Sequence, residues 1–131
     1  MSDLLSTGLA WLETQRTRFM AKSVIYRRPG GVGVPALDVV VLATVGKTTF
    51  EVVTAGGVLD RVESRDYLIA ADALTAIGLP QRGDRVIEDV GGARHTAEVL
   101  APGREPHWRW SDITRASFRI HTKHLTTEPH P

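Results

Sequence analysis

A chain of 131 residues without cysteine is most simply one domain, and it can form neither a disulfide framework nor a thiolate metal site. Its 42% hydrophobic and 24% charged content is ordinary for a folded protein and argues against disorder as the main state. No apolar run approaches the roughly 20 residues that a membrane-spanning helix needs, and the first residues lack the pattern of a signal peptide. We therefore expect a soluble protein that is made in the cytoplasm and has no membrane partner.

The net charge of +1 is unevenly distributed along the chain. Residues 1–31 hold five basic and two acidic side chains, residues 32–103 hold six basic and ten acidic ones, and residues 104–125 again hold five and two. Basic ends around an acidic middle suit head-to-tail contact between copies of the chain. Charge scattered over the surface without a role is the alternative.

An amphipathic helix is predicted at the N-terminus, because Leu5, Leu9, Leu12 and Phe19 follow helical spacing over residues 3–21. Such a helix must bury its apolar stripe. Packing on the sheet of its own chain is one solution, and packing on a partner subunit is the other.

Short β-rich segments separated by turn residues occupy most of the remaining chain. They predict strands at residues 23–28, 38–44, 49–54, 59–69, 85–89, 94–100, around 108 and at 116–123. Turns are expected at residues 45–48, at 55–57 and at Gly91-Gly92, and a short second helix is expected at residues 70–77.

These elements together predict a mainly β fold. We expect a small antiparallel β-barrel or sandwich with an N-terminal amphipathic α-helix and a short second helix. In this single domain, residues 1–22 form the helix packed on the barrel, residues 23–125 form the barrel, and residues 126–131 form a flexible tail.

The glycine-rich run at residues 29–35 invites comparison with a phosphate-binding loop. It is followed by a β-branched strand instead of a helix, and it lacks the Gly-Lys-Ser/Thr ending. We therefore interpret it as a mobile hairpin or interface loop.

Trp108 and Trp110 stand two residues apart in an extended segment and therefore face the same side. Arginines interleaved with aromatic side chains in a β-barrel would suit single-stranded nucleic acid. Because the overall charge is nearly balanced, we favour the aromatic residues as core and the arginines as rim. The expected structural anchors are Trp11, Trp108, Trp110 and Phe118.

No catalytic pattern emerges from the chain. Ser111, His107 and Asp112 are the residue types of a hydrolase triad, but their surroundings do not resemble a nucleophile elbow. His121 and His124 are three residues apart, a spacing that places them on opposite faces of a strand. We predict no enzyme activity, no cofactor and no metal site.

Four segments carry a family resemblance: VESRDYLI at residues 62–69, GDRV at 83–86, WRWSD at 108–112 and RIHTK at 119–123. With them, residues 3–124 resemble small prophage-encoded neck proteins. The resemblance is to head–tail joining proteins of tailed phages, in the connector or stopper class.

This resemblance implies a structural role in the virion neck, where copies form a ring between portal and tail and help to retain packaged DNA. It implies portal or adaptor proteins, tail proteins and further copies of the chain as partners, with non-specific DNA contact. Tail-completion (terminator) proteins and β-barrel nucleic-acid-binding modules are the alternatives. The candidate contacts with other subunits or DNA are Arg27, Arg28, Gly30, Gly31, Gly33, Arg104, Arg109 and Arg115.

Overall fold

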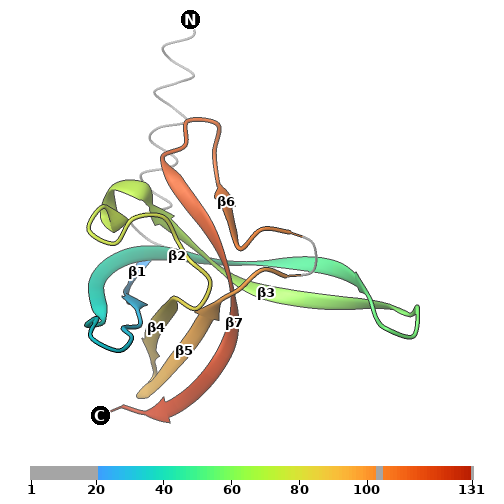
Figure 1. Cartoon of the computed structure of the whole chain (residues 1–131), viewed down its shortest axis with the longest axis horizontal. Coiled ribbons are helices and arrows are strands. Elements are labelled where there is room, and N and C mark those ends of the chain that lie inside the picture. Colours follow the sequence, from blue (N-terminus) through green and yellow to red (C-terminus); the bar gives the residue numbers. More distant parts are fainter. Residues whose placement is uncertain (1–20, 103–104, 131) are drawn as a thin grey trace, which may run out of the picture.

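A computed structural model describes residues 21–102 and 105–130 of the chain (Figure 1). These residues form seven strands and one 3-10 turn, η1. The elements are β1 (Ala21–Arg28), β2 (Leu37–Val53), β3 (Leu59–Ala70), η1 (Ala71–Leu74), β4 (Arg85–Val90), β5 (Ala93–Val99), β6 (Trp108–Trp110) and β7 (Ser117–Pro129).

The strands make one antiparallel sheet in the order β3-β2-β1-β4-β5-β7-β6. β3 also pairs with β7, so every strand except β6 belongs to a sheet that closes on itself. The register between β5 and β7 shifts at Thr96 and Ala97, which leaves Leu125 without a partner. Such a bulge bends a strand, and here it lies in the long β7, which follows β3 first and β5 afterwards.

The interior of the closed sheet is filled by alternate residues of its strands. Val24 and Tyr26 of β1 are buried, while their neighbours Ser23 and Ile25 are less so, as expected for strands with one face toward a core. The same alternation brings in Val41, Ala43, Tyr67, Ile69, Val86, Ala97, Val99, Phe118 and Ile120. Each such buried aliphatic or aromatic side chain contributes about 1.5–3 kcal/mol relative to an exposed one.

Buried acidic residues of and next to β4 anchor this strand to its neighbours. Glu88 accepts hydrogen bonds from Lys22, Arg65 and Tyr67, and Asp84 accepts them from Tyr26 and Arg28. Burial raises the pKa of Tyr67 to about 12, so its hydroxyl stays protonated and donates to Glu88. A buried carboxylate with several donors stabilises only the arrangement that keeps all of them in place.

The predicted fold class is wrong as stated, because the described residues contain no α-helix. The second helix predicted at residues 70–77 is only the 3-10 turn η1, Ala71–Leu74. Four residues are too few for the successive backbone hydrogen bonds that stabilise an α-helix. Nearly all of the predicted N-terminal helix, residues 1–20, lies outside the described residues, and its last residues, Ala21 and Lys22, belong to β1.

Two further boundaries differ from the sequence-based expectation. The turn predicted at residues 45–48 does not form, and β2 runs through it without interruption. Val45, Thr48 and Thr49 favour an extended chain, and Gly46 lies against the guanidinium of Arg119, which takes up the space beside it. Residues 126–129, predicted as a tail, extend β7 and pair with β5.

Candidate interaction surface

The most prominent surface feature is a hairpin that leaves the closed sheet, residues 48–64, which we call the arm (Figure 1). Within it, β2 and β3 pair only with each other, because the pairing of β1 ends at Thr44 and that of β7 ends at Arg65. A two-stranded ribbon buries little surface and is marginally stable alone. The arm therefore presents most of its side chains to a partner or to water.

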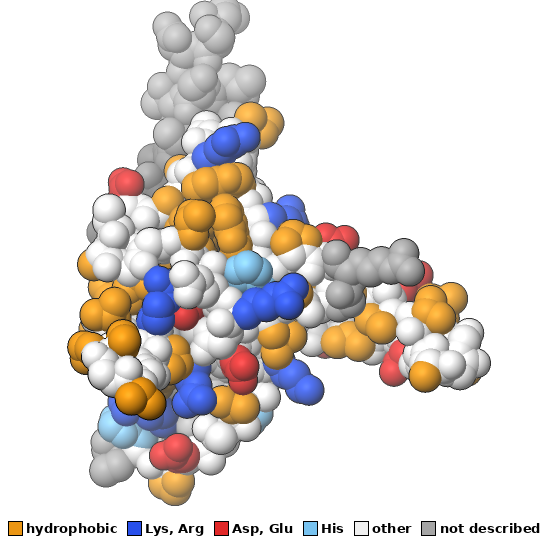
Figure 2. All heavy atoms as spheres, viewed as in Figure 1, with side chains coloured by type: hydrophobic (Ala, Val, Ile, Leu, Met, Phe, Trp, Pro, Cys, Tyr) orange, Lys and Arg blue, Asp and Glu red, His pale blue; other side chains and the backbone are white. Residues whose placement is uncertain are grey.

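Hydrophobic side chains gather toward the end of the arm (Figure 2). Val53, Val58 and Leu59 are 67%, 64% and 63% exposed. Nearer the closed sheet, Phe50 packs edge-on against His121 with ring centroids 5.2 Å apart. Exposed β-branched and aliphatic residues clustered in this way are typical of protein interaction sites.

The loop between β1 and β2 is a second projection with exposed apolar residues. Gly31 and Val34 exchange backbone hydrogen bonds of 3.0 and 3.1 Å, and Val32 between them is fully exposed. Gly33 has a φ of 74°, which favours glycine. The loop is thus a small hairpin of defined shape with a valine at its tip.

Gly30→Ala is expected to distort this loop. A Cβ on Gly30 would lie 2.1 Å from the carbonyl oxygen of Val34, so the backbone must move. Overpacking of this kind costs about 1–3 kcal/mol. Thermal unfolding should show the loss, and hydrogen exchange should show faster opening of the Gly31–Val34 bridge. Gly31→Ala is the matched control, because a Cβ there meets nothing within 4 Å; equal effects of the two substitutions would contradict this account.

A buried polar cluster lies where the arm joins the closed sheet. Asp66 is fully buried and accepts hydrogen bonds from Arg119 at 2.7 Å, from Ser64 at 2.5 Å and from Thr48. His121 Nδ1 lies 2.8 Å from the same carboxylate. Burial raises the pKa of Asp66, but the hydrogen bonds from these four side chains more than offset it and hold that pKa well below its usual value. The cluster ties β2, β3 and β7 together at the base of the arm.

Ser64, His121 and Asp66 are also the residue types of a hydrolase triad, but their arrangement differs from one. Ser64 Oγ approaches the same imidazole nitrogen as Asp66, at 3.4 Å, and donates its hydrogen to that carboxylate. In a triad the carboxylate and the hydroxyl occupy opposite nitrogens of the ring. This geometry therefore cannot pass a proton from serine through histidine.

The three residues considered for a triad from the sequence are engaged elsewhere. Ser111 donates to the carbonyl of Ser117, and His107 lies 2.8 Å from the carbonyl of Pro80. Asp112 binds the backbone of the loop before β7. Across the part of the chain that the structure describes, no group of three or more His, Cys, Asp or Glu side chains could hold a metal ion.

The candidate arginines fall into two groups. Arg27 forms two hydrogen bonds with Asp38 on the surface, and Arg28 binds Asp84 and the carbonyls of Ile77 and Leu79. Arg28 is therefore occupied within the fold. In contrast, Arg109 and Arg115 are exposed and form no side-chain hydrogen bond or ion pair within residues 21–102 and 105–130. Arg104 lies outside the described residues.

The paired tryptophans pack together with Phe118. Trp108 lies edge-on to Trp110 and to Phe118, with centroids 5.3 and 5.0 Å apart, and Trp110 stacks on Phe118 at 4.8 Å. β6 and β7 pair through these positions, Trp108 opposite Ile120 and Trp110 opposite Phe118. Trp11, the other expected anchor, lies outside the described residues.

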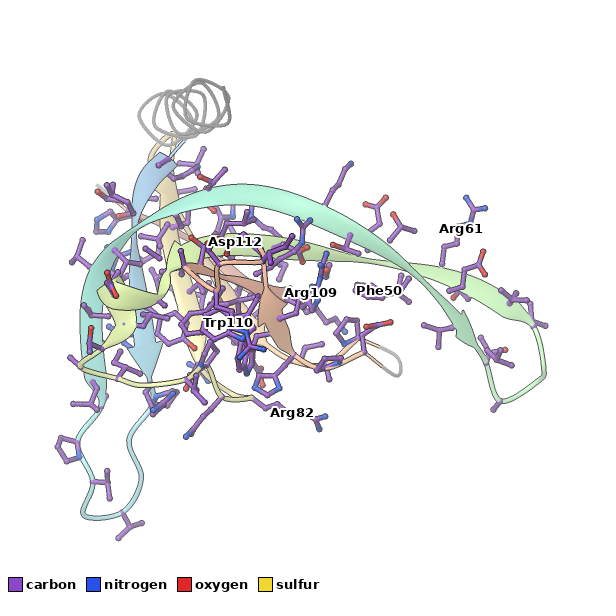
Figure 3. All side chains as sticks on the ribbon, turned by 90° about the horizontal axis from the view of Figure 1, so that it is seen from above. Phe50, Arg61, Arg82, Arg109, Trp110 and Asp112 are labelled. Carbon is purple, nitrogen blue, oxygen red and sulfur yellow. The ribbon has the colours of Figure 1, made fainter. Side chains whose placement is uncertain are left out.

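Arg109 belongs to the other face of β6. It stands opposite Arg119 in the register, and Figure 3 shows it beside the closed sheet, whereas Arg61 lies far out on the arm. Arg119 is paired with Asp66, whereas Arg109 has no ion-pair partner among the described residues. The charge of Arg109 is therefore available to an anionic partner.

Sequence reasoning predicted the hairpin turn at residues 55–57 but missed that this hairpin leaves the sheet as an arm, and it missed the cluster around Asp66. The arm had a partial signal, since Val45, Thr48 and Thr49 are β-branched and a glycine turn follows at Gly56-Gly57. The cluster had none, because Thr48, Asp66 and Arg119 come together only through the pairing of distant strands.

The comparisons with known proteins add one match. A family model described as phage head-tail joining protein matches residues 2–129. A search of curated proteins finds no match. Among the described residues, no helix is long and apolar enough to cross a membrane.

Proposed function

Because this chain belongs to the phage head-tail joining protein family, we propose that it is a structural protein of the virion neck that forms a ring between portal and tail. The observation that carries the proposal is the family match over almost the whole chain. Through its ring, the protein joins the filled head to the tail and helps to retain the packaged DNA. Its partners are portal or adaptor proteins, tail proteins and further copies of itself.

The form of the molecule supports an assembly role. The arm and the β1–β2 loop both project from the closed sheet and carry exposed valine and leucine side chains. Projections of this kind bury their apolar surface when neighbouring subunits meet. Heterologous contacts that return to the first subunit produce a closed ring.

Arg109 and Arg115 are the residues best placed to contact DNA. Both are exposed, and no acidic side chain in the described ranges neutralises them. Contacts of arginine with phosphate do not depend on base sequence. Such contacts suit a neck protein that meets DNA of any sequence. Arg27 and Arg28 are less suitable, because each already binds an aspartate.

Removing the gene from the phage that encodes it should leave separate heads and tails in the lysate, with heads that have lost part of their packaged DNA. The proposed role requires the protein at the junction and not in building either part. Electron microscopy counts joined and separate particles, and nuclease digestion measures DNA that has leaked from the heads. Supplying the wild-type gene in trans should restore joined particles. Normal numbers of joined, infectious particles without the protein would overturn the proposal.

A further inference from the structure

We propose that the arm of one copy docks into a groove at the fork between β3 and β7 of the next copy. This inference rests on the proposed ring and names the contact that builds it. Three observations carry it: the shape of the fork, its unpaired strand edges and its charge.

The fork arises because two paired strands separate. β3 and β7 pair from Arg65–Thr122 to Ala70–Ser117. After Thr122, β7 pairs with β5 instead. Before Arg65, β3 pairs only with β2, in the arm. The space between them is an open groove of about 760 Å³. It is lined by Val45, Gly46, Lys47, Glu63, Ser64, Arg65, Thr122, Lys123 and His124.

Both sides of the fork are strand edges with pairing on one side only. Residues 59–64 pair with β2, and residues 123–129 pair with β5, but neither stretch has a second partner among the described residues. Open edges of this length attract further extended chain, and natural proteins cover them. A β-hairpin is a natural occupant, because its own backbone is already extended.

The charges of the fork and of the arm are complementary. Lys47 stands opposite Arg65 in the register, and Lys123 lines the same groove, which also contains one acid, Glu63. Arg65 binds Glu88, whereas neither lysine has an ion-pair partner within the described residues. The two lysines therefore leave positive charge in the groove, which an acidic partner would offset. The arm supplies two acids, Glu51 and Asp60, although Glu51 stands opposite Arg61 in the register.

The occupant must come from another copy. Lys47 forms part of the fork, and Val53 near the end of the arm lies six residues farther along β2, about 20 Å at the usual rise of a strand. The paired arm cannot fold back over this distance without breaking its own ladder. Docking in the next copy also covers Val53, Val58 and Leu59, and it makes each contact heterologous, as a closed ring requires.

Cross-linking tests the contact directly, because the chain has no cysteine of its own. Gly56→Cys places a thiol on the arm, where a Cβ meets nothing within 4 Å, and His124→Cys places one in the fork. One chain carries an added tag, so that mixed and like pairs separate on a gel. After mild oxidation, the mixed pair G56C with H124C should form several-fold more dimer than G56C with A76C. Ala76 is the control because it is exposed and lies just after η1.

A charge exchange provides the second measurement. Glu51→Lys with Asp60→Lys on the arm chain should remove the excess of mixed dimer. Lys47→Glu with Lys123→Glu on the fork chain should restore it. The inference would be overturned if G56C formed equal amounts of mixed dimer with H124C and with A76C. It would also be overturned if the charge substitutions left the yield of mixed dimer unchanged.

These outcomes are separable from the proposed function. If cross-linking shows no preference but phage without the gene still fail to join heads to tails, the neck role stands and the arm contact is wrong. If phage without the gene join normally, the neck role is wrong whatever the cross-linking shows.

Discussion

Replacing Asp66 with alanine should lower the free energy of unfolding by about 3–5 kcal/mol, because it breaks a buried ion pair from one side. Arg119 and His121 would lose their shared acceptor, and His121 is only 2% exposed and has little access to water. Urea denaturation followed by tryptophan fluorescence measures the change, since Trp108 and Trp110 lie on the strand paired with β7. The loss should also lower the melting temperature by roughly 10 °C or more in a domain of this size.

Asp38→Ala is the matched control for this substitution. Asp38 also accepts hydrogen bonds from an arginine, Arg27, at 2.8 and 2.9 Å, but both side chains are exposed. Exposed pairs contribute about 0–1 kcal/mol. A loss at Asp38 as large as that at Asp66 would show that burial is not the deciding factor.

The same carboxylate should make stability depend on pH. Its pKa in the folded chain is lowered, so it stabilises the fold fully above its unfolded pKa of about 4 and loses this effect as the pH falls toward the folded value. The difference in stability between the wild type and Asp66→Asn should shrink as the pH falls below about 4. A difference that grows on acidification would contradict this sign.

The substitutions Trp108→Ala and Arg109→Ala should affect the stability of the fold very differently although the residues are adjacent. Trp108 contacts both Trp110 and Phe118, so its loss should cost about 2–4 kcal/mol of folding free energy. Arg109 is exposed on the other face of β6, and its removal should change stability by less than about 0.5 kcal/mol. Thermal unfolding measures the first effect.

Assembly measures the second effect. In phage lacking the gene, Arg109→Ala supplied in trans should restore fewer joined particles than the wild type, although the variant is fully folded. Trp108→Ala should fail in proportion to its loss of folded protein. Equal losses of thermal stability in the two variants would count against this division between anchor and contact.

Much of the strand pattern could be predicted because it depends on neighbours in sequence. The hairpin at Gly91-Gly92 forms as expected, and both glycines have positive φ. Gly57, also at positive φ, marks the predicted turn at the end of the arm. In each case the turn chemistry is local, so the residues themselves contain the signal.

The failures concern features that depend on distant partners. Gly46 and Lys47 resemble a turn, yet pairing with Asp66 and Arg65 of β3 keeps them extended. The sequence also contains no sign that Arg28 binds Asp84, 56 residues away, and two carbonyl groups. Tertiary contacts of this kind override local preference and leave no mark in the surrounding sequence.

The position of β7 at the end of the chain has a consequence for how the protein folds during synthesis. β7 pairs with β3, β5 and β6, all of which precede it, and the sheet cannot close until Ser117–Pro129 has been synthesised. During translation, the edges of β3 and β5 that pair with β7 therefore stay unpaired until β7 has been made. Because these pairings join residues far apart in the sequence, they form slowly. A nascent or prematurely terminated chain would be prone to aggregation, so chaperone binding should be strongest just before β7 emerges from the ribosome.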